Sequence, residues 1–329
     1  MPTTTYETVT TKQTLNRVQE ERMPFDWSIN PYRGCAHGCS FCYARAFQSF
    51  MGLGAEDEFQ FRIMMKSNAA EALEKQLSGM ARKLGHDIDA LGRQIGQVTI
   101  GTATDPYQPI EGKAEITRAC LKVLAKYRIS TSITTRSPLV LRDLDILTQM
   151  KDVSVNISIN TLDPGIIRKL EPASPHPHQR LEALLGLSEA GIQTGIFAAP
   201  VLPFITDEEE GLRQLLMAAK ERGAAFAMIS LLRLSKDVKR WYMQTLKEQF
   251  PDKLASYYEL YRGPYAEEGY VRSFKQMAAK LLAQCGMNDG SAPAQPRVKA
   301  ASTRKLPRPS AEVTVRELTP EVEQLSFPF

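Results

Sequence analysis

The sequence contains few cysteines and no long apolar run. Its 329 residues include five cysteines, a sparse and odd number that argues against a disulfide-stabilised fold and favours a reducing compartment. No stretch reaches the roughly 18 consecutive apolar residues that predict a membrane span. The first residues, MPTTTYETVTTKQTLNRVQEER, lack the apolar core of a secretory signal. We therefore expect a cytoplasmic protein. The net charge is only +4, which by itself does not indicate a nucleic-acid partner.

Three of the cysteines gather in the segment 30–45, NPYRGCAHGCSFCYAR, with the spacing C-x3-C-x2-C. They are Cys35, Cys39 and Cys42. Gly34 and Gly38 allow the turns that bring such close thiolates around a metal or cluster. Iron–sulfur clusters usually take four cysteine ligands, so three would leave one iron with an open position, as catalytic metal sites have. A structural zinc loop is the alternative, although zinc usually takes four ligands and His37 lies between two of the cysteines.

The cysteine spacing, with the aromatic Phe41 just before the third cysteine, resembles that of the radical S-adenosylmethionine superfamily. The resemblance implies that the open iron of a 4Fe–4S cluster binds the amino and carboxylate groups of S-adenosylmethionine. It also implies that the reduced cluster cleaves this cofactor to methionine and a 5′-deoxyadenosyl radical, which abstracts hydrogen from a substrate. An electron donor such as flavodoxin or ferredoxin is then an implied partner.

Strands and helices alternate along most of the chain. Six strands are expected at 27–33, 97–103, 129–135, 153–160, 192–199 and 225–232. Helices are expected at 44–51, 69–84, 116–127, 139–150, 179–190, 208–222, 236–249, 257–261 and 273–284, and a further strand at 59–66. This alternation predicts a parallel sheet, and the resemblance implies a partial (β/α)6 TIM-type barrel. Chemistry in such barrels lies at the carboxyl ends of the strands, where the cysteine loop would lie.

The expected organisation has three parts. Residues 1–24 are polar and threonine-rich and are predicted to form a flexible arm. Residues 25–285 form the core barrel with its C-terminal helices. Residues 286–329 are predicted to be a disordered tail, because they contain few apolar groups and many prolines and charges.

Further blocks narrow the resemblance to the branch that contains spore photoproduct lyase and the DNA repair photolyases. The blocks read TDPYQPIE, TTRSPLVLRDLD, SINTLD and APVLP. This resemblance implies lyase-like action on DNA or nucleotides and a cofactor pocket lined by Phe41, Tyr43, Thr102, Thr104, Arg136, Ser158 and Asn160. The guanidinium of Arg136 is a fork suited to a carboxylate or phosphate.

One feature departs from the branch. The lyase returns hydrogen to its product from a cysteine after the second strand, whereas the corresponding VTIGTATDPYQPIE contains none. Tyr107 and Tyr43 are candidate donors in its place. Cys120 is expected to be a small core residue on a helix, and Cys285 to lie at a helix end before a glycine stop. Two alternatives remain open: the same radical chemistry on RNA, a peptide or a metabolite, and a non-catalytic adaptor that holds a cluster or zinc and binds nucleic acid.

The end of the sequence, QLSFPF, resembles the hexapeptide by which bacterial replication and repair proteins bind the DNA polymerase sliding clamp. By that resemblance Gln324 caps the binding pocket, and Leu325, Phe327 and Phe329 fill it. The sliding clamp is thus an expected partner. The alternative is that this end folds back onto the barrel.

Overall fold

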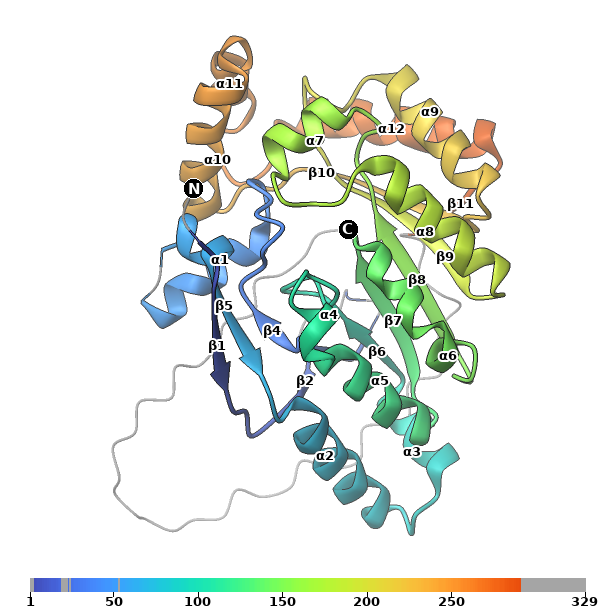
Figure 1. Cartoon of the computed structure of the whole chain (residues 1–329). Coiled ribbons are helices and arrows are strands. Elements are labelled where there is room, and N and C mark those ends of the chain that lie inside the picture. Colours follow the sequence, from blue (N-terminus) through green and yellow to red (C-terminus); the bar gives the residue numbers. More distant parts are fainter. Residues whose placement is uncertain (1–2, 19–22, 24, 53, 291–329) are drawn as a thin grey trace.

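The computed structural model describes residues 3–18, 23, 25–52 and 54–290 (Figure 1). Its larger sheet contains parallel strands that lie side by side in the order of the chain. They are β3 (Trp27–Ile29), β6 (Gln97–Ile100), β7 (Ser130–Thr135), β8 (Val153–Ser158), β9 (Gln193–Val201) and β10 (Phe226–Leu231). Two short strands extend the sheet: β2 (Leu15–Arg17) pairs antiparallel with β3, and β11 (Asn288–Asp289) pairs parallel with β10. The prediction of six parallel strands in a partial barrel is confirmed.

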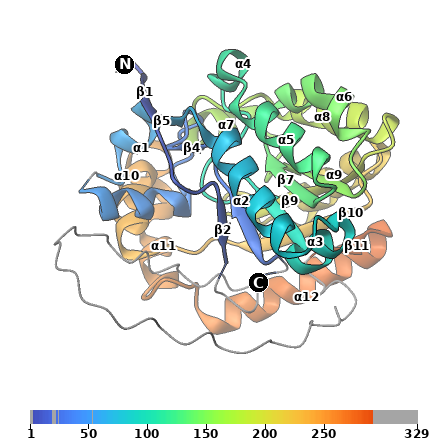
Figure 2. The same cartoon turned by 90° about the horizontal axis from the view of Figure 1, so that it is seen from below.

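Helices form an outer ring around the strands (Figure 2). They include α2 (Ala69–Lys83), α3 (Ile88–Ile95), α5 (Ile116–Lys126), α6 (Leu144–Leu147), α8 (Pro177–Glu189), α9 (Glu209–Glu221) and α12 (Glu268–Cys285). Each of the longer helices has an apolar stripe that packs inward; in α2 the stripe includes the fully buried Leu73 and Leu77. Strand residues such as Ile133, Val155 and Ile196 are fully buried and complete the core. No helix of the described chain is long and apolar enough to cross a membrane.

A second, smaller sheet lies beside the first and has the strand order β1-β5-β4. Its strands are β1 (Thr5–Val9), β5 (Arg62–Lys66) and β4 (Tyr32–Arg33). The prediction of a flexible arm over residues 1–24 is therefore wrong for β1 and β2. Leu15 is buried, and the Thr14 hydroxyl donates to the Ala69 carbonyl oxygen at 2.7 Å. Threonine-rich segments suit strands. β1 pairs with β5, which lies far along the chain, whereas β2 pairs with the nearby β3, and local composition reveals neither pairing.

Some predicted elements differ in type or extent. The expected strand 27–33 is interrupted at Asn30 and Pro31, so β3 and β4 belong to different sheets. The expected strand 59–66 begins as helix α1 (Asp57–Phe61), and the expected helix 44–51 is the 3-10 helix η1 (Tyr43–Met51). The expected helix 139–150 is a 3-10 turn, η2 (Pro138–Asp143), followed by α6. Three short helices were not predicted: α3, α4 (Glu111–Ala114) and α7 (Pro164–Leu170).

The chain after β10 forms a helical pair, α10 (Lys236–Gln249) and α11 (Leu254–Leu260), joined by η3 (Pro251–Lys253). This pair stands at the end of the molecule where the parallel strands terminate (Figure 1). Strand β11 lies within the segment 286–329 that was predicted to be disordered, so that prediction is wrong for its first residues. Gln324, Leu325, Phe327 and Phe329 lie outside the described residues.

Candidate active site

The three cysteines lie on one loop between β4 and η1. Cys35 and Cys39 are buried, and Cys42 is partly exposed. The preceding Gly34 has a φ of +75°, and a Cβ there would come within 2.8 Å of the Arg62 carbonyl oxygen. Only glycine combines this conformation with so close an approach. The loop is therefore held against β5 at a defined position.

Gln108, a fully buried residue of the TDPYQPIE block, holds the start of the cysteine loop. Its side-chain oxygen accepts a hydrogen bond from the Ala36 backbone N–H at 3.0 Å. Its amide group donates to the Gly34 carbonyl oxygen at 3.4 Å and to the Thr104 hydroxyl at 3.2 Å. Thr104 in turn donates to the same carbonyl at 2.6 Å. Thr104, a predicted cofactor contact, thus bonds to the loop backbone.

Arg45, which the sequence did not single out, fixes the second half of the loop. Its guanidinium is fully buried and donates to the Cys39 carbonyl oxygen at 2.7 Å and to the Gly38 carbonyl oxygen at 2.8 Å. It also lies 5.0 Å from the Phe59 ring and 5.1 Å from the Trp241 ring. The loop is therefore tied to α1 and α10 through one side chain.

The chemistry of the three thiols fits an iron–sulfur cluster. Burial raises the pKa of each thiol, that of Cys35 to about 12, and the neighbouring thiol of Cys42 acts on Cys35 in the same direction. Arg136 opposes this rise for all three. A bound metal removes the proton from a coordinating thiol, and cysteine thiolates are the usual cluster ligands. Among the described residues, no three histidine, cysteine, aspartate or glutamate side chains are arranged to bind a single metal ion.

Arg136 follows β7 and reaches the cysteine loop. One guanidinium nitrogen contacts the Cys39 sulfur, and the other donates to the Ser158 hydroxyl at 3.2 Å. The carboxylate of Glu171 lies 3.9 Å away and also accepts a hydrogen bond from Arg180 at 2.6 Å. The structure thus brings together two predicted site residues, Arg136 and Ser158, with one of the cysteines.

Asp105 and His37 form a buried pair beside this group. Oδ1 of Asp105 accepts from the Tyr107 backbone N–H at 2.8 Å and from the Thr135 hydroxyl at 2.6 Å, and Oδ2 accepts from the Arg136 backbone N–H at 2.9 Å. The His37 ring nitrogen Nε2 lies 3.3 Å from Oδ2, outside hydrogen-bond alignment. Burial alone would raise the pKa of Asp105, but His37 and these donors lower it to about 2. Sequence reasoning did not identify this pair, whose members lie far apart in the chain.

Two predicted cofactor contacts, Thr102 and Tyr43, meet at the end of β6. The Thr102 hydroxyl accepts from the Asn30 side-chain amide at 2.9 Å, and the Thr102 carbonyl accepts from the Tyr43 hydroxyl. Tyr43 is 37% exposed, whereas Phe41 is buried. Phe41 packs in the apolar cluster that includes Tyr242 of α10. Of these aromatic side chains, Tyr43 is therefore the accessible one.

Asn160 follows β8 and carries an unsatisfied buried atom. Its amide nitrogen donates to the Pro200 carbonyl oxygen at 3.3 Å, while its side-chain oxygen has no hydrogen-bond partner among the described residues. Buried polar atoms are seldom left without a partner. The free acceptor of Asn160 is thus available for a donor group on a bound molecule.

Tyr107, a candidate hydrogen donor, is fully buried. Its hydroxyl donates to Asp143 at 3.0 Å, and burial with this carboxylate raises its pKa well above the ordinary value. Asp143 also accepts from Arg118 at 2.7 Å, and Arg142 joins it to the buried Glu111. The TDPYQPIE and TTRSPLVLRDLD blocks therefore meet in a buried ion-pair network, and Tyr107 belongs to it.

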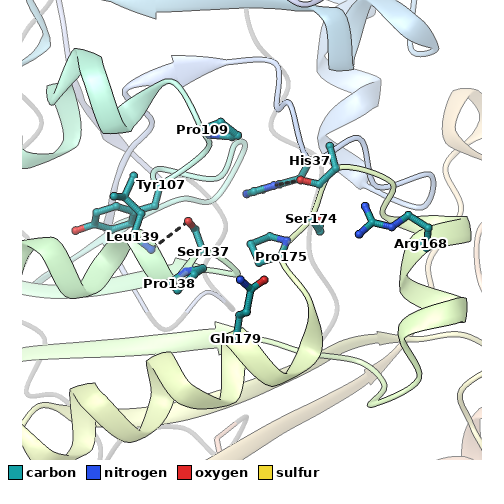
Figure 3. A pocket seen from close by; sticks show the side chains of 11 residues that line it. His37, Tyr107, Pro109, Ser137, Pro138, Leu139, Arg168, Ser174, Pro175 and Gln179 are labelled. Atoms are coloured by element: carbon teal, nitrogen blue, oxygen red, sulfur yellow. Dashed lines mark hydrogen bonds between the residues drawn. The ribbon is translucent and has the colours of Figure 1, made fainter. Parts of the chain in front are cut away.

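An open pocket with a volume of about 560 Å³ lies beside the cysteine loop (Figure 3). It is lined by residues from the loop, from α7 and α8, and from the segments that follow β6, β7 and α7. Figure 3 shows the His37 ring facing Pro175 and Gln179, and Tyr107 with its hydroxyl directed away from the pocket. The buried His37 ring therefore forms part of the pocket wall.

Comparisons with known proteins concern the family and the fold of the chain. Residues 29–216 match the Radical SAM superfamily. An uncharacterized protein of Mycobacterium tuberculosis is 32% identical over 302 residues, which cover 90% of this chain and 86% of that protein.

Two solved structures share the fold. Spore photoproduct lyase complexed with dinucleoside spore photoproduct has a TM-score of 0.62 and 17% identity, covering 85% of this chain and 79% of that chain. SuiB of Streptococcus suis bound to precursor peptide SuiA has a TM-score of 0.51 and 16% identity, covering 80% of this chain and 47% of that one. At these identities the likeness concerns the fold.

Proposed function

Because this chain belongs to the radical SAM superfamily, we propose that Cys35, Cys39 and Cys42 hold a 4Fe–4S cluster and that the chain acts with S-adenosylmethionine on DNA. When bound and reduced, the cluster would supply the electron that splits S-adenosylmethionine into methionine and the hydrogen-abstracting 5′-deoxyadenosyl radical. The observation that carries the proposal is the contact of Arg136 with Cys39, because it brings a strand-end cation against a thiol of the loop.

The chain's own residues would hold the reacting groups in place. Gln108 and Arg45 bind the backbone of the cysteine loop from its two sides. Rigid support of this kind keeps ligands within the narrow tolerance that a catalytic site needs. Asp105 stays ionised at neutral pH, since its pKa is about 2. It accepts a hydrogen bond from the Arg136 backbone N–H and so fixes the backbone from which the Arg136 side chain extends.

The S-adenosylmethionine pocket would lie where β6, β7 and β8 end. Thr102, Arg136, Ser158 and Asn160 come from these strand ends. Arg136 would meet the cofactor carboxylate, since guanidinium forks suit that group. Asn160 would accept a hydrogen bond from the cofactor through its unsatisfied oxygen. Tyr43, with its exposed ring, would lie near the adenine.

DNA is the proposed substrate, by a lyase-like repair reaction. The support is the fold shared with spore photoproduct lyase, which was solved with a dinucleoside lesion and which the likeness covers over most of both chains. SuiB, solved with a precursor peptide, shares the fold over less than half of its own chain. Because SuiB was solved with a peptide, a peptide is the second candidate substrate, and it ranks below DNA because less of that chain is covered. Tyr43 is the proposed hydrogen donor, because its side chain is accessible and that of Tyr107 is buried.

The proposal includes two partners and a cytoplasmic location. An electron donor such as flavodoxin or ferredoxin would reduce the cluster. The sliding clamp would bind the segment from Gln324 to Phe329, as its resemblance to the clamp-binding hexapeptide implies. Titration of that peptide against a bacterial clamp should give micromolar binding that is lost when Gln324, Leu325 and Phe327 are changed to alanine. A titration without binding would remove this partner.

Cluster assembly tests the first step of the proposal. After anaerobic reconstitution, the protein should bind iron and sulfide, and Cys39→Ala should lose most of both. Cys120→Ala is the matched control, because Cys120 is equally buried but lies in α5, away from the loop. Equal iron content in the two variants would contradict the assignment of the ligands.

A further inference from the structure

A groove with four cations lies between α10 and α11. It has a volume of about 460 Å³ and is lined by Lys236, Lys239, Arg240 and Lys247, with Met243, Leu254 and Tyr258 among the other residues. The acidic side chains of α10, Asp237 and Glu248, do not line it. Lys236, Arg240 and Lys247 form no salt bridge with any described residue. The ion pairs of the chain after α10 involve Lys253, Arg272 and Lys280 instead. The groove therefore presents a positive charge that the protein itself leaves unneutralised.

The position of two of these cations is unfavourable for the helix alone. Lys236 and Lys239 lie in the first turn of α10, where the helix dipole favours negative side chains. Lys239 is also held in place, because its ammonium group donates to the Tyr261 carbonyl oxygen. The bond to Tyr261 accounts for Lys239, and Asp237 offsets part of the positive charge in this turn. Lys236 has no such partner among the described residues, and binding of an anion would account for it.

An exposed aromatic ring borders the same groove. Tyr258 is 57% exposed, the highest exposure of any large apolar or aromatic side chain in the described residues. Proteins that bind single strands of nucleic acid combine a positive groove, which follows the phosphates, with aromatic rings on which bases stack. A simple acidic peptide would use the cations and leave the ring without a partner.

Helix α10, which forms one side of the groove, also contacts the side chain that holds the cysteine loop through a residue outside the groove. Trp241 of α10 lies 5.1 Å from the guanidinium of Arg45, which binds the loop backbone at Cys39 and Gly38. The helical pair stands at the end of the molecule where the strands terminate (Figure 1). A strand bound in the groove would therefore lie at the end of the barrel where the chemistry is proposed.

From these observations we infer that the α10–α11 groove binds the sugar–phosphate backbone of a DNA strand beside the catalytic barrel. The inference rests on the proposed function for its choice of DNA. Lys236, Arg240 and Lys247 would each contact a phosphate, and Tyr258 would stack on a base. The site would select a polynucleotide over a free nucleotide, because several phosphates are needed to occupy it.

The test compares two triple variants of the full, anaerobically reconstituted chain. In the groove variant, Lys236, Arg240 and Lys247 are changed to glutamate. In the control variant, Lys75, Arg82 and Lys83 of α2 are changed to glutamate. These three are exposed, form no salt bridge among the described residues and lie at the opposite end of the molecule (Figure 1). Both variants have the same change in net charge.

Binding is measured by the fluorescence anisotropy of a labelled oligo-deoxythymidine strand of about 20 nucleotides, long enough to span such a groove. The groove variant should bind at least about tenfold more weakly. The slope of log K against log salt concentration should also fall by about 2, because three phosphate contacts on a single strand are lost. The control should bind within about twofold of the wild type, since the effect of distant charges is screened. Tyr258→Ala should weaken binding without changing the salt slope.

Several results would overturn the inference. The first is an equal loss of DNA affinity in the two triple variants. The second is that poly-glutamate displaces the labelled DNA as effectively as unlabelled DNA does. The third is that oligo-uridine binds much more tightly than DNA.

Formation of 5′-deoxyadenosine without DNA is measured in parallel. If the wild type binds DNA through the groove but forms none, the proposed chemistry fails and the groove stands. If it forms the product and the groove variant binds normally, the groove alone fails.

Discussion

The guanidinium of Arg136 contacts the sulfur of Cys39, although the two residues are 97 positions apart in the chain. The same guanidinium donates to the Ser158 hydroxyl and lies near the Glu171 carboxylate. One cation thus links the candidate cluster loop to the ends of β7 and β8. This arrangement gives Arg136 two separable properties, its charge beside the thiol and its hydrogen-bonding fork.

Arg136→Ala should weaken S-adenosylmethionine binding by about 2 kcal/mol, the range for a lost charge-assisted hydrogen bond. Iron content should remain that of the wild type, because the loop backbone is held by Gln108 and Arg45. Arg136→Lys should recover part of the affinity, since it retains the charge without the fork. Equilibrium dialysis with labelled cofactor measures the effect, and unchanged affinity in Arg136→Ala would return this residue to a structural role.

Gly34→Ala should destabilise the protein by about 3 kcal/mol and lower its iron content. The new Cβ would clash with a backbone oxygen at 2.8 Å and would also require a φ of +75°. Gly85→Ala is the matched control. It has a φ of +63° but nothing within 4 Å of the added atom, so only the conformational term of about 1 kcal/mol remains. Urea unfolding and iron analysis check both variants, and equal destabilisation would show that the loop can move.

The titration of Lys66 should make the free energy of unfolding rise with pH in the alkaline range. Burial, together with the charge of Arg33, lowers its pKa from 10.5 to about 8. Between these values the unfolded chain binds more protons than the folded one, so the free energy of unfolding increases as pH rises from about 8 to about 10.5. The difference is at most about 3 kcal/mol.

Lys66→Met should lack this increase, because it has no group to titrate. The quantity to measure is the difference in unfolding free energy between wild type and variant at each pH, which cancels the thiols that titrate in both. Lys83→Met, at an exposed position, should behave as the wild type does. A difference between wild type and Lys66→Met that stays constant with pH would contradict the shifted pKa.

Tyr43→Phe and Tyr107→Phe should have different effects. Tyr43 is 37% exposed and its hydroxyl donates to the Thr102 carbonyl after β6, whereas Tyr107 is fully buried and bonded to Asp143. Tyr43→Phe should lower the amount of altered DNA formed per S-adenosylmethionine cleaved, as expected for loss of the proposed hydrogen donor. Tyr107→Phe should keep that ratio and lose about 1 kcal/mol of stability with its hydrogen bond. Mass analysis of ultraviolet-irradiated oligonucleotides after turnover measures the ratio, and a larger loss for Tyr107→Phe would reverse the assignment.

Much of the barrel could be predicted from the sequence, because its signals are local. Apolar stripes and turn residues located β6 to β10 and the helices α2, α5, α8, α9 and α10 to within a few residues. The cysteine spacing located the candidate cluster loop. The family resemblance implied one cofactor pocket for Arg136, Ser158 and Asn160, and the structure joins Arg136 to Ser158 by a hydrogen bond.

The remainder depends on contacts between distant residues. β1 pairs with β5, far along the chain, so its polar composition gave no sign of a strand. Tyr107 was a candidate hydrogen donor because the sequence does not show that its hydroxyl bonds to Asp143, which lies 36 positions away. The roles of Arg45 and Gln108 likewise reside in their bonds to backbone carbonyl and N–H groups of the loop, which no pattern of residue types encodes.

The most direct test of the central claim is the amount of 5′-deoxyadenosine that the anaerobically reconstituted, chemically reduced protein forms from S-adenosylmethionine. The account predicts that the wild type and Cys120→Ala form this product together with methionine, and that Cys39→Ala forms none. A wild-type protein that is loaded with iron and sulfide, is reduced, and still forms no 5′-deoxyadenosine would contradict it.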